Sequence, residues 1–83
     1  MSAREKDQAY EATRLSHEAT AQIVEYMRSV GMSRAALARS MGVTAGRVSQ
    51  ILSGAENLTL STLAAVAVAL DTRVWITLGP AAT

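Results

Sequence analysis

The segment SRAALARSMGVTAGRVSQILSG, residues 33–54, has apolar residues at helical spacing on either side of Gly42. We expect helices over residues 34–41 and 45–52, since each stretch could bury one face. Gly42 supplies the turn between them, because glycine adopts left-handed backbone conformations without strain. Ala38 lies one helical turn earlier, where a larger side chain would push the helices apart. The segment predicts two short helices that cross at about 90–120°.

Capping and core residues support the same pair of helices. Ser33 and Thr44 stand directly before them. Hydroxyl side chains at this position accept hydrogen bonds from the free N–H groups of the first turn. We expect a small core where the two helices would meet, formed by Leu37, Val43, Val48 and Ile51.

Two further helices are expected beside this pair. One runs over about residues 7–29, where apolar residues recur mostly in steps of three to five. That apolar stripe consists of Tyr10, Leu15, Ala19, Ile23, Met27 and Val30. The other begins after Thr59 or Ser61 and ends near Leu70, and alanine, the best helix former, recurs in it.

The C-terminal stretch differs from the rest of the chain. Residues 73–78 alternate and are rich in β-branched side chains, and Gly79-Pro80 follows them. This pattern predicts a short β-strand, with the whole arm covering residues 73–79. A single strand cannot satisfy its own backbone groups, so it pairs with a strand of another chain or lies against the body as an extended arm.

The composition excludes several kinds of site. The chain has 83 residues, enough for one domain over residues 1–83. Without cysteine it forms no disulfide and no thiolate metal site, and its one histidine excludes sites built on two imidazoles. We find no carboxylate pair, glycine-rich phosphate loop or nucleophile–base set at usable spacing. We therefore expect no enzyme, no metal and no other cofactor.

No stretch of the sequence predicts membrane insertion or export. The longest apolar run, residues 63–70, is far shorter than the ~18 residues that a membrane span requires. Residues 1–7 are charged and no apolar stretch follows them, unlike a signal peptide. We expect a soluble cytoplasmic domain.

The charge is unevenly distributed along the chain. The net charge is only +1, but residues 26–54 carry four arginines and no acid. The segments on either side, residues 1–25 and 55–83, are both net acidic. A local cationic region on a nearly neutral protein is the electrostatic pattern expected of a protein that binds a phosphate-rich polymer.

The spacing of these motifs points to a known family. The residues concerned are Leu37-Ala38, Gly42-Val43-Thr44, Val48-Ser49, Ile51, Gly54, Asn57-Leu58-Thr59-Leu60, Leu63, Ala67 and Leu70. Over about residues 23–70 the chain resembles the lambda-repressor-like, or Xre-type, helix-turn-helix regulators. The resemblance implies a mainly α, four-helix bundle that binds DNA. The long first helix and the short C-terminal β-strand depart from the usual family domain.

The resemblance also implies that the helix over residues 45–53 enters the major groove of DNA. Its outward residues, as base contacts, are Ala45, Gly46, Arg47, Ser49 and Gln50. Arg47 can bond guanine through O6 and N7, and Gln50 can bond adenine through N6 and N7, each with ~1–3 kcal/mol of discrimination. Phosphate or flanking contacts are expected from Arg28, Arg34, Arg39, Thr44, Ser53 and Asn57.

Two biological roles follow from the resemblance. One is a homodimeric repressor of bacterial or phage origin that acts at the nucleoid and binds a palindromic operator in double-stranded DNA. It would dimerise either through the long first helix, by burying its apolar stripe, or through the C-terminal strand, by pairing across a two-fold axis. The candidate dimer contacts are Val74, Trp75, Ile76 and Leu78. The alternative is an antitoxin that acts mainly by covering a toxin protein.

Overall fold

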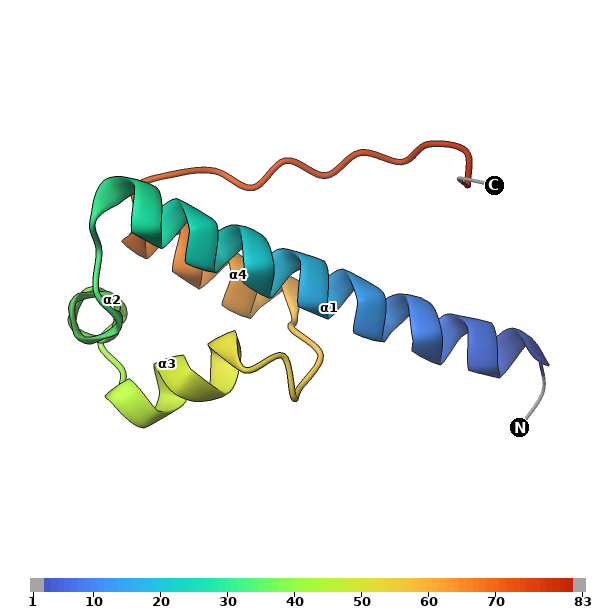
Figure 1. The fold of residues 1–83 in the computed structure, drawn as a ribbon, viewed down its shortest axis with the longest axis horizontal. Helices are drawn as coiled ribbons and strands as arrows, with labels where there is room; N and C mark the ends of the chain where they lie inside the picture. The colour runs from blue at the N-terminus through green and yellow to red at the C-terminus, as the bar shows by residue number, and fades with distance from the viewer. Residues whose placement is uncertain (1–2, 82–83) are drawn as a thin grey trace.

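The computed structural model describes residues 3–81 and is mainly α-helical, as predicted. Its elements are α1 (Ala3–Val30), α2 (Arg34–Met41), α3 (Ala45–Leu52) and α4 (Leu60–Ala69). The expected bounds of α2 and α3 are confirmed, and α4 starts directly after Thr59 rather than after Ser61. The two short helices and α4 lie on one side of α1 (Figure 1).

The length of α1 sets the shape of the molecule. A helix of 28 residues rises about 42 Å at 1.5 Å per residue. The longest dimension of the structure is also 42 Å, against 25 and 19 Å across. The N-terminal half of α1 therefore projects beyond the other helices, as Figure 1 shows.

Charged side chains support this projecting half. The Arg14 guanidinium donates two hydrogen bonds to the Glu11 carboxylate, both at 2.8 Å, and one to Glu18 at 2.7 Å. These residues stand three and four positions apart, which places them on one face of the helix. The hydrogen bond from Arg14 lowers the pKa of the Glu11 carboxyl from its usual value, which favours the charged form of the pair.

Each of the three shorter helices begins at a hydroxyl cap. Ser33, Thr44 and Thr59 have extended backbones, and each side-chain oxygen accepts a hydrogen bond from the N–H three residues later. The distances are 3.0–3.1 Å. Each cap satisfies one N–H that has no partner inside its helix. The capping role predicted for Ser33 and Thr44 is confirmed.

The turns at the helix ends use left-handed residues. Gly42 has φ 70°, and the bond from Val43 N–H to the Ala38 carbonyl at 3.0 Å closes α2. The same geometry ends α4 without a glycine. There Asp71 has φ 53°, and Thr72 N–H donates to the Ala67 carbonyl at 2.9 Å. Aspartate is among the few residues that tolerate this conformation.

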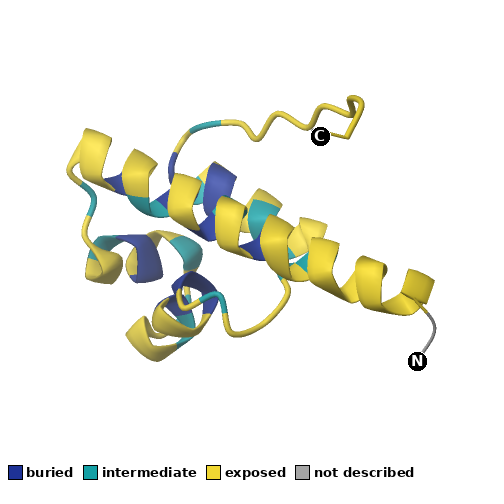
Figure 2. Ribbon diagram, turned by 45° about the vertical axis from the view of Figure 1, so that its right-hand side comes forward, coloured by how far each residue is buried: buried dark blue, intermediate teal, exposed yellow. Residues whose placement is uncertain are grey.

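All four helices contribute to one small core (Figure 2). Its most completely buried side chains are Leu37 of α2, Val48 of α3 and Val66 of α4. The other core residues are Ile23, Met27, Ala38, Ile51, Leu52 and Leu70. Of the core positions expected in the central segment, Leu37, Val48 and Ile51 are confirmed, whereas Val43 in the turn is only partly buried and packs against this core.

The apolar stripe predicted for α1 is wrong in its first half and at its last member, Val30, which is exposed. Tyr10 is 73% exposed and Leu15 is also exposed, whereas the buried positions there are Ser16 and Thr20. Thr20 donates to the Ser16 carbonyl at 3.0 Å, which satisfies its hydroxyl without a distant partner. The buried face follows a helical spacing, but its first two members are hydroxyl residues.

The predicted C-terminal β-strand is also wrong. Residues 72–81 are extended, and no strand occurs within residues 3–81. A strand requires a ladder of backbone hydrogen bonds, and no other segment within the described range supplies one. The arm instead runs beside α1 (Figure 1). A groove of about 870 Å³ lies between the arm and the outer faces of α1 and α4.

The loop between α3 and α4 is fastened to α1. The buried Ser16 hydroxyl accepts a hydrogen bond from Leu58 N–H at 3.2 Å and donates one to Asn57 Oδ1 at 3.3 Å. Gly54 has φ 72° and lies against His17, so that an added Cβ would stand 2.9 Å from His17 Cδ2. These contacts hold the loop that follows α3 against α1.

We expect Gly54→Ala to destabilise the fold more than Gly31→Ala. Both glycines are left-handed, which costs an alanine about 1–2 kcal/mol, but only Gly54 faces a side chain. The free energy of unfolding, measured with urea, checks this. Equal losses of unfolding free energy in the two variants would show that the His17 contact is unimportant. Gly79→Ala, at an open position, is the neutral control.

We expect Ser16→Ala to lower the free energy of unfolding by about 1–3 kcal/mol, because it leaves the Leu58 N–H without its partner. Ser29→Ala is the matched control, since Ser29 is exposed and bonds only to a carbonyl of its own helix. Urea unfolding of both variants measures the difference. A loss no larger than that of the control would contradict the anchoring role of Ser16.

Candidate nucleic-acid interface

Helix α3 presents one apolar and one polar face. Val48, Ile51 and Leu52 are buried in the core, which leaves the opposite face of the helix uncovered. The uncovered residues include four of the five predicted base contacts, Ala45, Gly46, Ser49 and Gln50, and the fifth, Arg47, is half-buried. The helix is thus held by its inner face and free to meet a partner with its outer face.

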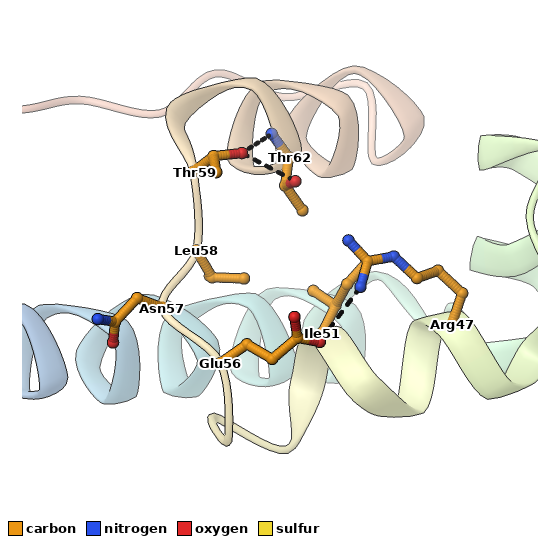
Figure 3. Close-up of a pocket in the computed structure, with 7 residues that line it drawn as sticks. All are labelled: Arg47, Ile51, Glu56, Asn57, Leu58, Thr59 and Thr62. Carbon is orange, nitrogen blue, oxygen red and sulfur yellow. Dashed lines mark hydrogen bonds and ion pairs between the residues drawn. The ribbon is translucent and has the colours of Figure 1, made fainter.

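The two long polar side chains of this face contact each other. Arg47 Nη1 donates to Gln50 Oε1 at 3.3 Å, as their spacing of three residues allows. The same nitrogen donates to Glu56 Oε1, also at 3.3 Å (Figure 3). An arginine and a glutamine that could read bases therefore form one connected group with a carboxylate from the following loop.

Small residues occupy the first turn of α3. Ala45 and Gly46 are exposed, and an added Cβ at Gly46 would meet nothing closer than Thr44 Oγ1 at 3.8 Å. Gly46 does not have a positive φ either. Neither the backbone nor the packing of the free protein thus requires glycine at position 46.

Three of the predicted phosphate contacts use their polar side chains within the fold. Thr44 caps α3 by accepting from Arg47 N–H at 3.1 Å. The Ser53 hydroxyl bonds to two backbone groups at the end of α3. Asn57 accepts from the buried Ser16 hydroxyl. Thr44 and Ser53 stand at the two ends of α3, whereas the Asn57 side chain lies against α1, and each of the three has a structural role.

The other predicted phosphate contacts are arginines outside α3. Arg28 pairs with Glu25 of its own helix at 2.6 Å. Arg34 begins α2 and Arg39 lies in its last turn, and both are exposed. Within residues 3–81 no hydrogen bond or ion pair joins any of these three side chains to α3. Arg34 and Arg39 have no acidic partner within that range either.

Sequence reasoning missed two residues that matter here. The sequence motifs assign no role to Glu56, yet its carboxylate contacts Arg47 on the polar face of α3. Ser16 carried no signal, because its partners lie 41 and 42 residues further along the chain. For Glu56 the available signal was its isolation, since it is the one acid between residues 26 and 70.

A small pocket of about 80 Å³ opens beside the Arg47–Glu56 contact, lined by α3, the loop and the start of α4 (Figure 3). It is far below the ~300 Å³ of a typical small-molecule site. No group of three or more potential metal ligands occurs in the described part of the chain. No helix there combines the length and apolar character needed to cross a membrane.

Comparison with known families agrees with the geometry of α2 and α3. Residues 23–74, more than half of the chain, match the family model described as Helix-turn-helix. Neither the comparison with curated proteins nor that with solved structures gave a match. The matched region includes α2, α3, the anchored loop and α4. The chain therefore belongs to the Xre-type, lambda-repressor-like helix-turn-helix family of DNA-binding regulators.

Proposed function

We propose that this protein is a sequence-specific transcriptional repressor that inserts α3 into the major groove of its operator. The major groove admits an α-helix and presents a distinct pattern of donors and acceptors for each base pair. Membership of a family of DNA-binding regulators supports DNA as the partner. The arrangement of side chains on α3 supports sequence-specific reading.

The main support for this proposal is the hydrogen-bonded pair of Arg47 and Gln50 on the outer face of α3. Arg47 has paired donors that match guanine O6 and N7, and the Gln50 amide matches adenine N6 and N7. Their mutual hydrogen bond keeps both side chains on the same face, so they would read neighbouring base pairs.

The small residues of the first turn suit close approach to DNA. Gly46 is not needed by the free protein, so its missing side chain is best explained by a partner. With Ala45 and Ser49 it would let the start of α3 come near the base edges. The Ala45 methyl group could contact a thymine methyl.

Phosphate contacts would come from the ends of the helices. Arg34 stands at the start of α2 and Thr44 at the start of α3, where backbone N–H groups and the helix dipole favour anions. Arg39 would add a positive charge near the phosphates. Arg28 would add another if its side chain left Glu25. Ser53 and Asn57 flank the end of α3. Such contacts position a protein on DNA without reading sequence.

We further propose that the repressor is a homodimer held by its C-terminal arms. Trp75 is 81% exposed and Leu78 is 96% exposed, and Ile76 and Val74 are also uncovered. Exposure of these apolar side chains to water is unfavourable. A second copy that covered the arm and filled the groove between the arm, α1 and α4 would remove them from water. Two copies would place two α3 helices on half-sites about 34 Å apart and so read a palindrome.

The same arm favours a second candidate function. An exposed apolar segment can cover another protein as well as a second copy, which suits an antitoxin that binds a toxin. The two proposals differ in what the isolated protein does. A repressor would form a dimer and bind DNA without any other protein. The antitoxin would stay monomeric until it binds a toxin, which would then co-purify with it.

We expect Arg47→Ala and Gln50→Ala each to reduce affinity for the selected operator about 5- to 100-fold, because each removes a contact worth ~1–3 kcal/mol. Arg34→Ala would weaken all sequences alike and reduce the salt dependence. Sites selected from a random DNA pool, then titrated at stated salt, measure this. Arg4→Ala, on the projecting part of α1, is the charge-matched control.

Unchanged operator affinity in both α3 variants would contradict base reading by this helix. Circular dichroism of each variant would establish that the helices remain folded, since both residues lie outside the core.

We expect Trp75→Ala with Leu78→Ala to shift the protein from dimer to monomer, because the pair removes the most exposed apolar side chains of the arm. Analytical ultracentrifugation over a concentration series measures the dissociation constant. Val68→Ala is the control, as Val68 is 78% exposed but does not line the groove. A wild-type monomer at all concentrations would refute the homodimer.

A further inference from the structure

An acid lies where a DNA-binding surface should avoid one. Glu56 is the one acidic residue between residues 26 and 70, and its side chain is 55% exposed. Near a duplex its charge would be repelled by the phosphates. Its carboxylate nevertheless stands 3.3 Å from Nη1 of Arg47, the cation proposed to read guanine. A position so unfavourable for general DNA affinity calls for a specific advantage.

The position of Glu56 is fixed by the fold. On one side of it, Gly54 rests against His17, and on the other, Asn57 and Leu58 are bonded to the buried Ser16. The loop therefore cannot easily turn the carboxylate away from α3. Figure 3 shows the Glu56 side chain extending from the loop toward the Arg47 guanidinium.

The contact leaves most of the guanidinium available. Arginine has five N–H donors in a planar fork, and Glu56 and Gln50 both bond to Nη1. Nε and Nη2 remain able to bond a base edge in the plane of the fork. A phosphate contact that drew the guanidinium away from the loop would break its bond to Glu56.

We propose that Glu56 is a positioning residue that holds Arg47 toward a base and away from the phosphates. Bound at its operator, Arg47 keeps Glu56 as a partner and adds guanine. On unrelated DNA it finds no such base, and a phosphate contact that draws it away from Glu56 costs it the ion pair. Glu56 therefore raises the ratio of specific to non-specific affinity. This inference rests on the proposed reading of DNA by α3.

The test measures that ratio for the full-length chain, with the selected operator and a scrambled duplex at several salt concentrations. We expect Glu56→Ala to lower the ratio about three- to fivefold, the size expected when an exposed ion pair is lost. Affinity for the scrambled duplex would rise and its salt dependence steepen. Base preference would relax at the one base pair that Arg47 contacts.

Glu11→Ala is the matched control. Glu11 carries the same charge, is 53% exposed and also pairs with an arginine, but it lies on the projecting half of α1. It should leave the ratio unchanged. Glu56→Asp keeps the charge and shortens the reach, so it should resemble Glu56→Ala if the contact with Arg47 matters. In an Arg47→Ala background, Glu56→Ala should have no further effect on base preference.

Three results would overturn the proposal. A ratio in Glu56→Ala equal to that of Glu11→Ala would show that the contact does not affect selectivity. An Asp variant identical to the wild type would leave only a general charge effect. If the wild type enriches no sequence from the random pool, both base reading by α3 and this inference fail, whereas the first two results leave base reading intact.

Discussion

The burial of Val48 holds in place the outer face of α3, the proposed DNA-binding surface. Helix α3 has only eight residues, too few to be stable as an isolated helix in water, so its existence depends on tertiary contacts. The Val48 side chain is 0% exposed and belongs to a core that also includes Ile23 of α1, Leu37 of α2 and Val66 of α4. Every outward residue of α3 takes its direction from this inner contact. The specificity of the outer face is thus limited by the rigidity of a very small core.

The long first helix contributes to the site from a distance. Ser16 does not belong to the region that matches the family, yet it anchors the loop that carries Glu56. This loop also changes the charge map. Along the chain the central segment has four arginines and no acid, but in space Glu56 reaches Arg47 and Glu25 reaches Arg28. The cations without acidic partners in the described range are thus fewer than a linear count indicates.

Local signals could be read from the sequence, and long-range ones could not. Thr44 and Gly42 act within three or four residues, so the cap, the turn and the bounds of α2 and α3 were predictable. Ser16 was not, because an inward hydroxyl is favourable only when a partner far along the chain reaches it. The arm has the composition of a strand, but a strand also requires a neighbour. The outward residues of α3 were correctly placed, while the acid among them came from outside the motif.

The unbroken course of α1 has a geometric consequence. Each residue of an α-helix advances 1.5 Å and turns 100° about the axis. Because no bend or loop separates the projecting half from the part packed in the core, removing one residue between Ala3 and Leu15 would rotate everything before it by that angle. The orientation of a group fused to this helix, relative to the outer face of α3, would therefore depend only on the number of residues between them. Adding or removing single residues in this part of α1 would change the direction of such a group in steps of about 100°.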